Sequence, residues 1–399
     1  MYSLIYVVIF FIIFILSIPL LPKKSIVNFS YTYDFSEYLK EFLVFLVLLV
    51  FLGFRGYVAT DYVNYYPFFQ DIPSLFDSDF SLDYFNTNGW EKGYLLYALI
   101  CKTICPSFIF FQFISVLIDF LFIRYFIRLY LPNNSRIFAY AMFFSFYGLG
   151  IEFNLYRNVK ALLIFLYSLR FILSKQFWKF SFCIFLACLF HKSSIIFLPF
   201  YFFIGKQWKR KTVFSLWIIG NLICILRISY LKNFGLFVSD FLPGLYGDLI
   251  KLYFNSEKFG AAYSLGFGWL ERQVSFFLIF YYSKDSVDKN SMTNVFLNFA
   301  YLYFFIWLYC SELSIFIERI ALLFVFGFWF IVPYIYSKIS RKGKVYFLVY
   351  FLFMGFLKVF IGYNVFEYNY KLIMFDDFES RKNLFIKEYK KLFLESFFA

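Results

Sequence analysis

The sequence predicts an all-α, polytopic integral membrane protein. Hydrophobic residues make up 62% of the 399 positions and charged residues only 16%, whereas globular domains carry about 25% charged residues. Apolar runs close to the length that spans a bilayer recur along the chain and alternate with polar segments. We therefore expect about 12 transmembrane helices, within a range of roughly 10 to 14, together with short re-entrant or interfacial helices.

The first apolar run, Tyr2–Leu21, is expected to be a retained helix. It has no basic segment before it and no small-residue cleavage site after it, so it does not match a signal peptide. Lysine and arginine concentrate in short cytoplasmic loops, which places Lys23 and Lys24 inside. The second run, residues 39–54, returns the chain to the outer face, so the loop that begins at Arg55 is predicted to be external.

The external segment, residues 55–106, ends in an apolar stretch that is too short to span. This stretch runs from Glu91 to Cys105 and stops at Pro106, which is typical of an interfacial or re-entrant helix. A full span is expected at residues 107–126. Three arginines mark its inner end: Arg124, Arg128 and Arg136.

The long apolar run at residues 178–204 is predicted to break in its middle. It follows two spans, at residues 137–151 and 155–173, and basic clusters flank both of its ends. A single span would leave one of these clusters outside, against the charge rule. We therefore predict two short limbs that meet near His191–Ser194. This break brings the only histidine in the chain to the outer side.

The remaining apolar runs are predicted to cross the membrane alternately outward and inward. They lie at residues 213–231, 271–283, 295–310, 319–337 and 345–363. Residues 232–270 are predicted to form a second external loop. We divide the chain into a transmembrane domain, residues 1–365, and an amphipathic tail, residues 366–399, whose basic residues fit poorly with an external location. Much of the net charge of +13 lies in inner loops, so we attribute it to topology and expect no nucleic-acid partner.

The ionisable residues that the inner loops do not explain collect at the outer face. They are Arg55, Asp61, Glu91, Glu152, Arg157, Lys160, His191, Glu271, Arg272, Glu318 and Arg319. Such groups cost roughly 2.5 to 3.5 kcal/mol each at membrane depth, so they are functional candidates facing a cavity. Arg157 and Arg319 are each predicted to open an inward helix, where the helix dipole and the guanidinium together favour a phosphate.

Structural interpretations of the same residues stay open. Arg55 can extend to the lipid head groups, Asp61 can form a turn after Thr60, and His191 can hydrogen-bond at a helix end. Arg319 can pair with Glu318 or Glu312. Glu271 and Arg272 are adjacent on a helix and do not face each other.

The sequence contains none of the usual signatures of a metal or nucleotide site. One histidine cannot build a histidine-rich site, the six cysteines lack C-x-x-C spacing, and no P-loop or Rossmann fingerprint is present. We expect metal-independent chemistry without a cofactor. The energy for the reaction then has to come with the substrate.

Several short motifs stand in a specific order along the chain. They are Phe54-Arg55, Thr60-Asp61-Tyr62, Tyr65-Tyr66, Glu91-Lys92-Gly93-Tyr94, Asn154 with Arg157, Ala187 with Phe190-His191-Lys192-Ser193, Leu198-Pro199 and Glu318-Arg319-Ile320. Over residues 1–365 this order resembles the EpsG-like branch of the Wzy-type polysaccharide polymerases. Lys160 departs from the pattern, because an apolar or small residue is expected there, and the tail has no counterpart.

The resemblance implies an enzyme of the bacterial inner membrane, with a GT-C-like architecture compatible with its fold. Such an enzyme joins oligosaccharide repeat units, carried on undecaprenyl diphosphate, at the outer face for O-antigen, capsule or exopolysaccharide. Its expected partners are this lipid-linked oligosaccharide, membrane lipid, a chain-length regulator and a flippase. A polyprenyl-phosphate-dependent single-sugar glycosyltransferase, a lipid-linked oligosaccharide flippase and an anchoring protein remain alternatives.

We assign hypothetical roles to the candidate residues. Arg55, Arg157 and Arg319 would hold the diphosphate, and His191 or Asp61 would accept the proton of the attacking hydroxyl. Imidazole can act as a base near neutral pH, whereas a carboxylate needs a raised pKa. The other predicted substrate-binding residues are Glu91, which would orient sugar hydroxyls, Lys160, Glu318, and the sugar-stacking Tyr62, Tyr65 and Tyr66.

Overall fold

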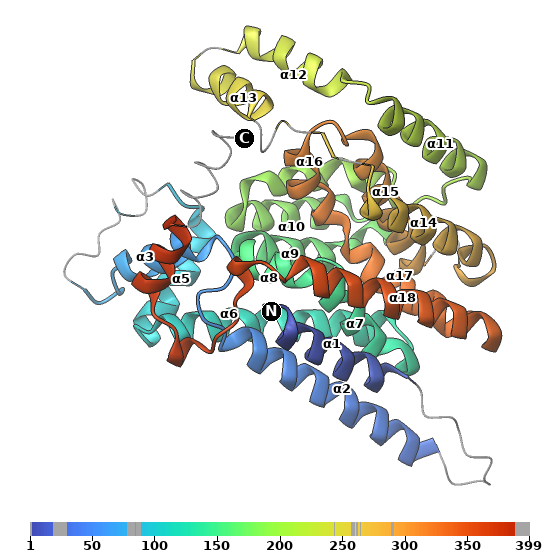
Figure 1. The fold of residues 1–399 in the computed structure, drawn as a ribbon, viewed down its shortest axis with the longest axis horizontal. Coiled ribbons are helices and arrows are strands. Elements are labelled where there is room, and N and C mark those ends of the chain that lie inside the picture. Colours follow the sequence, from blue (N-terminus) through green and yellow to red (C-terminus); the bar gives the residue numbers. More distant parts are fainter. Residues whose placement is uncertain are drawn as a thin grey trace. The chain divides into compact units, whose positions relative to one another are not determined.

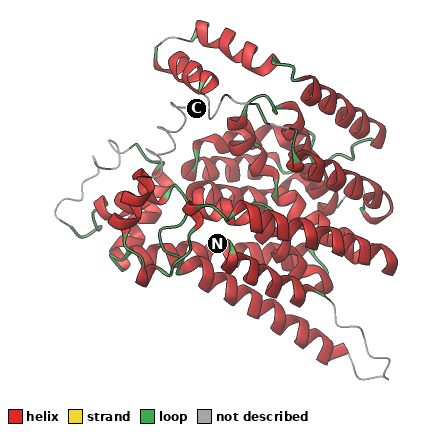
Figure 2. Ribbon diagram, viewed as in Figure 1, coloured by secondary structure: helices red, strands yellow, loops and turns green. Residues whose placement is uncertain are grey.

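The described part of the computed structural model consists of helices joined by loops, without a strand, and the predicted all-α class is confirmed (Figure 2). It describes residues 2–18, 30–77, 84, 89–242, 244–256, 260, 262–263, 265–288 and 291–387. The chain divides into two compact units. The first comprises Met1–Pro199 and Phe351–Ala399, and the second comprises Phe200–Tyr350.

The first unit contains most of the candidate residues. Its helices are α1 (Leu4–Ser17), α2 (Ser30–Gly53), α3 (Tyr62–Asp71), α5 (Lys92–Ile104), α6 (Phe108–Tyr130), η1 (Asn133–Ser135), α7 (Arg136–Ser145), α8 (Gly148–Asn154), α9 (Tyr156–Leu173) and α10 (Phe177–Phe190) (Figure 1). Helix α9 packs against α10, α2 against α6, and α1 against α7. The tail adds two short helices, η4 (Phe366–Tyr368) and η5 (Ile373–Phe375).

The second unit is built around α15, a buried helix without charged residues. Its elements are α11 (Arg210–Leu226), α12 (Tyr230–Phe241), α13 (Leu245–Asn255), α14 (Phe267–Ser286), α15 (Met292–Tyr309), α16 (Ser314–Arg319), η3 (Ala321–Phe324) and α17 (Phe326–Lys338). Helix α15 packs against α11 and α17, and Phe296 stacks on Phe330 with ring centroids 4.5 Å apart. Helices α12 and α13 form within the segment 232–270, whose external location stays a prediction. Two further helices cross the unit boundary: η2 (Lys192–Phe202) and α18 (Arg341–Gly362).

The predicted number of about 12 spans is not confirmed. Among the described residues, four helices are long and apolar enough to cross a membrane: Phe108–Tyr130, Met292–Tyr309, Ala321–Lys338 and Arg341–Gly362. A fifth results if α11 and α12, which are bent by 78° at their junction, count as one span. Several predicted spans form shorter helices, such as α1 and α10 with 14 residues each. At about 1.5 Å per residue, such a helix is shorter than the roughly 30 Å hydrocarbon core.

Two local predictions are confirmed. The short helix expected after Glu91 is α5, which ends at Ile104. The break expected in the run 178–204 lies at His191, where α10 ends and the backbone becomes extended (φ −155°, ψ 116°) before η2 begins. This break gives His191 a position beyond the last turn of α10.

Candidate active site

The loop that follows α2 is held by the C-terminal tail. Arg55 forms an antiparallel bridge with Leu372, and the Gly56 N–H donates a 2.7 Å hydrogen bond to the Lys371 carbonyl. The Ala59 N–H similarly donates to a tail carbonyl at 2.7 Å. These contacts attach the tail to the loop within the first unit.

An acidic residue in the tail completes this attachment. The Asp376 carboxylate accepts a 2.9 Å hydrogen bond from the Tyr57 N–H and pairs with Arg381 at 2.9 Å. A Cβ atom at Gly56 would clash with the Asp376 side chain, so only glycine allows this close approach. The first part of the tail is thus a packed component of the first unit.

Arg55 is buried and joins three helices. Its guanidinium donates to the Leu52 carbonyl at 2.6 Å, to the Glu152 carbonyl at 2.9 Å and to the Tyr156 hydroxyl at 2.6 Å. The side chain is only 1% exposed. Its predicted contact with a phosphate stays a prediction, and the geometry favours a structural role that links the end of α2 to α8 and α9.

Lys160 is also buried, in the interface of α6 and α9. Its ammonium group forms an ion pair with Asp119 and donates to the Ser115 hydroxyl at 2.8 Å. Sequence reasoning missed Asp119. A pattern could have found it, because Gln112, Ser115 and Asp119 follow the helical i, i+3, i+7 spacing and mark a polar stripe on the otherwise apolar first half of the helix. The predicted substrate contact of Lys160 is untested, and this ion pair supports a role inside the helix bundle.

Glu91 brings together two residues that lie far away in the sequence. Its carboxylate forms an ion pair with Arg157, which is in the first turn of α9, and lies 3.4 Å from Nδ1 of His191. Glu91 occupies the N-cap position of α5 but makes no capping hydrogen bond with its side chain. The carboxylate is instead turned towards the two cationic or basic groups. We refer to Glu91, Arg157 and His191 as the Glu91 triad.

The Glu91 triad is accessible from outside the protein. The side chain of Arg157 is 27% exposed and that of His191 is 23% exposed, while Glu91 between them is 8% exposed. Arg157 also lies over the ring of Trp90, 4.5 Å from its centroid, which is the geometry of a cation–π contact. This arrangement combines a cation, an imidazole and an aromatic surface at one place.

The electrostatics of the site keep Glu91 ionised. Burial by itself would raise the pKa of Glu91, but the interactions with His191 and Arg157 outweigh it and lower the pKa to about 2. In contrast, burial raises the pKa of the neighbouring Tyr65 to about 12, an effect that Arg157 partly opposes. At neutral pH the site therefore holds a carboxylate, a guanidinium and a neutral phenol.

Asp61 and the tyrosines predicted to stack on sugars lie near this site, and the contacts described for them are with other residues of the protein. Asn154 Oδ1 accepts hydrogen bonds from the Thr60 N–H at 3.1 Å and from its hydroxyl at 3.2 Å, which orders the loop at Asp61. The rings of the three tyrosines pack on other aromatic residues of the protein: Tyr62 and Tyr66 on Phe378, and Tyr65 on Trp90 and Tyr156. Their stacking on sugars stays a prediction, and Trp90 is an aromatic residue of the site that the sequence prediction did not include.

A family model described as the EpsG family matches residues 38–372, which is most of the chain. The chain belongs to the EpsG family. The match extends beyond the predicted limit at residue 365 and includes Leu372, which bridges to Arg55. Comparison with curated proteins and with solved structures finds no match. The EpsG family is associated with polysaccharide polymerase activity, and together with the apolar helices it indicates a membrane-embedded protein of this type.

The last candidates of this EpsG-family protein lie in the second unit. Arg319 is exposed and ends α16, so it precedes the span Ala321–Lys338 and does not open it as predicted. The side chain of Glu318 is outside the described part of the structure. Glu271 accepts a 2.9 Å hydrogen bond from Ser275, and Arg272 stacks on Trp307 at 3.2 Å. These contacts support structural roles for Glu271 and Arg272.

Proposed function

We propose that this EpsG-family protein is a glycosyltransferase of the Wzy type, a polysaccharide polymerase. It joins oligosaccharide repeat units that are carried on undecaprenyl diphosphate, at the outer face of a bacterial inner membrane. The observation that carries the proposal is the Glu91 triad. One ionised carboxylate holds a phosphate-binding guanidinium and a proton-accepting imidazole at an accessible position.

The proposed reaction uses the Arg157 guanidinium and the His191 imidazole in the same step. A sugar hydroxyl of one lipid-linked unit attacks the anomeric carbon of the other, and its proton passes to His191 as the new glycosidic bond forms. The bond between the anomeric carbon and the diphosphate oxygen breaks, and the lipid diphosphate leaves. Arg157 stabilises the charge that develops on this leaving group, assisted by the positive end of the α9 dipole.

Glu91 has a positioning role in this proposal. Because an ionised carboxylate only accepts hydrogen bonds, it favours the imidazole form that carries its proton on the facing Nδ1 atom. The Nε2 atom of His191 is then the proton acceptor. Glu91 also fixes the direction of the Arg157 guanidinium, while its predicted contact with sugar hydroxyls remains an alternative. No metal or cofactor takes part in the proposed chemistry.

Deletion of the gene in its own host tests the function. Surface and lipid-linked glycans are separated on a gel, with the wild-type gene restored as the control. Loss of the long-chain ladder while single repeat units still reach the surface would support a polymerase. Complete repeat units trapped on the cytoplasmic side would identify a flippase, and a truncated repeat unit would identify a single-sugar glycosyltransferase.

The choice between His191 and Asp61 as the base can be tested in the same assay. We expect His191→Ala to lower the amount of polymer roughly 100-fold or more, the usual loss when a general base is removed. Asp61→Asn, which keeps the shape of the side chain, is expected to retain most of the ladder. Full activity of His191→Ala together with loss of activity in Asp61→Asn would assign the base to Asp61.

A further inference from the structure

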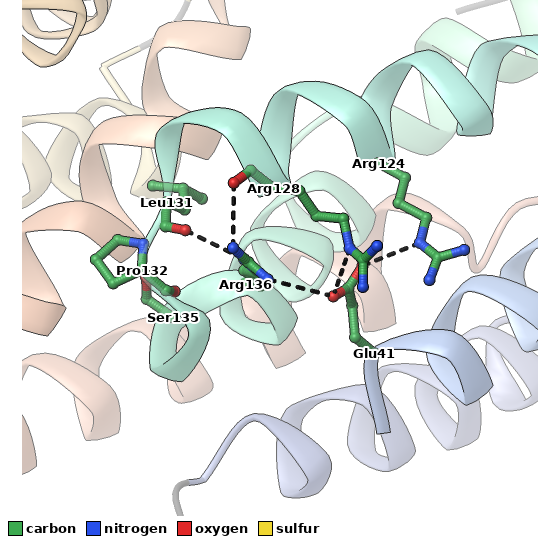
Figure 3. Close-up of polar contacts among 7 residues, drawn as sticks. All are labelled: Glu41, Arg124, Arg128, Leu131, Pro132, Ser135 and Arg136. Carbon is green, nitrogen blue, oxygen red and sulfur yellow. Dashed lines mark hydrogen bonds and ion pairs between the residues drawn. The ribbon is translucent and has the colours of Figure 1, made fainter. Parts of the chain in front are cut away.

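A second cluster of charged residues lies where the middle of α2 meets the C-terminal end of α6 and the start of α7. Three arginines surround the carboxylate of Glu41: Arg124, Arg128 and Arg136 (Figure 3). The Nε atoms of Arg124 and Arg128 both lie 3.0 Å from Glu41, and Nη1 of Arg136 lies 3.9 Å from it. We call this group the Glu41 cluster.

The Glu41 cluster has more positive than negative charge. Its three guanidinium groups share one carboxylate, and the nearby Glu37 is already paired with Lys40 at 2.7 Å. Four positive and two negative side chains leave a net charge of +2 at this place. Arginine does not lose its proton in proteins, so the cluster keeps this positive charge and favours an anion.

The arginines also have donors that Glu41 does not use. Arg124 and Arg128 each turn Nε towards the carboxylate, which leaves their terminal nitrogens directed elsewhere (Figure 3). Nη2 of Arg124 is buried and has no hydrogen-bond partner among the described residues. Beside the cluster is a cavity of about 190 Å³, which Arg136 lines together with Glu37, Tyr38, Glu41 and Asn133. The cluster thus keeps donors that Glu41 does not use, and the cavity lies on the side of Arg136.

The position of the cluster along α6 relates it to the membrane. At one end of α6, the Gln112 side chain donates to the Arg55 carbonyl at 2.7 Å, next to the candidate active site. Arg128 is 16 residues further along α6, a distance of roughly 24 Å at about 1.5 Å per residue. Since the hydrocarbon core is roughly 30 Å thick, the cluster lies near the membrane surface opposite to the candidate active site.

Apolar side chains are exposed on α2 and α6 near the cluster. Leu43 on α2, and Tyr125 and Leu129 on α6, are between 46% and 52% exposed. These helices pack against each other, so their exposed faces can contact acyl chains directly beside the Glu41 cluster. Basic pockets between transmembrane helices are known to bind anionic lipid head groups.

We propose that the Glu41 cluster binds the phosphate of an anionic membrane phospholipid, in the leaflet opposite to the candidate active site. The acyl chains lie along the exposed faces of α2 and α6, and the phosphate contacts the terminal nitrogens of the arginines. The rule that basic residues stay inside explains why arginines occur at this end. It does not explain the buried Glu41 carboxylate, which fixes the positions of the arginines. A specific binding site requires such fixed positions.

The test measures lipid binding to the purified, full-length protein in detergent. Phosphatidylglycerol, phosphatidylethanolamine and glycerol phosphate are titrated separately, with bound lipid counted by native mass spectrometry and the melting temperature recorded. We expect saturable binding of phosphatidylglycerol, weaker binding of phosphatidylethanolamine, and no stabilisation by glycerol phosphate. Equal effects of the two lipids, or stabilisation by glycerol phosphate alone, would overturn the assignment to an anionic lipid.

A pair of matched variants locates the site. Arg128→Gln removes a partly exposed arginine of the cluster, and we expect it to weaken phosphatidylglycerol binding roughly tenfold. Arg170→Gln removes the same charge from an arginine that stacks on Tyr167 outside the cluster, and is expected to bind like the wild type. If Arg128→Gln does not accumulate, Arg128→Lys, which loses the bidentate geometry, replaces it, with a several-fold loss expected. Unchanged binding in the cluster variants would contradict the proposal.

Discussion

Arg157→Ala is expected to abolish polymer formation, lowering the amount of long-chain glycan roughly 100-fold or more. The guanidinium is the cation of the Glu91 triad and lies in the first turn of α9. Its removal takes away the charge that stabilises the departing diphosphate and leaves the Glu91 carboxylate with His191 and the Lys192 N–H. Gel analysis of surface glycans, after the variant gene replaces the wild type in the host, measures the effect.

The amount of protein in the membrane separates this catalytic effect from misfolding. Arg157 is partly exposed, so the variant is expected to accumulate to nearly the wild-type level. Arg170→Ala serves as the matched control, since it removes an arginine that stacks on Tyr167 near the opposite end of the same helix. Arg157→Lys keeps the charge but not the fork of donors, so we expect an intermediate loss. A normal ladder in Arg157→Ala would exclude this residue from the diphosphate site.

Arg55→Met is expected to destabilise the protein by roughly 3 to 5 kcal/mol. The substitution leaves the carbonyls of Leu52 and Glu152 without the Arg55 donor, and the Tyr156 hydroxyl keeps only its hydrogen bond to Gln112 among those described. It also removes the charge next to the bridge with Leu372, so the contact between loop and tail is expected to weaken. The melting temperature of the purified protein and its level in the membrane measure the loss.

The same substitution tests the alternative role of Arg55 as a phosphate ligand. Under that hypothesis, Arg55→Met would accumulate and melt like the wild type while polymer formation fell. Arg170→Met is again the control for the loss of an arginine. A stable but inactive Arg55→Met protein would thus refute the structural role and support Arg55 as a ligand of the diphosphate.

Composition alone determined the class of this protein, because a chain with 62% hydrophobic and 16% charged residues has to place helices in lipid. Charge placement also predicted the helix break at His191. Basic clusters flank both ends of that apolar run, and a single span cannot place both of them on the cytoplasmic side. The number of spans could not be obtained in this way. Helices α15 and α17 are buried by the protein itself, and an apolar sequence does not distinguish protein contacts from lipid contacts.

For the candidate site, the sequence by itself nominated Glu91, Arg157 and His191 as separate polar residues at helix ends. Only the tertiary structure decided that one carboxylate joins them, and that Arg55 and Lys160 are instead enclosed by carbonyls and by Asp119. The physical reason is that helical periodicity and charge report which face and which end of a helix a residue occupies. The partner of a charged group depends on how helices from distant parts of the chain pack together.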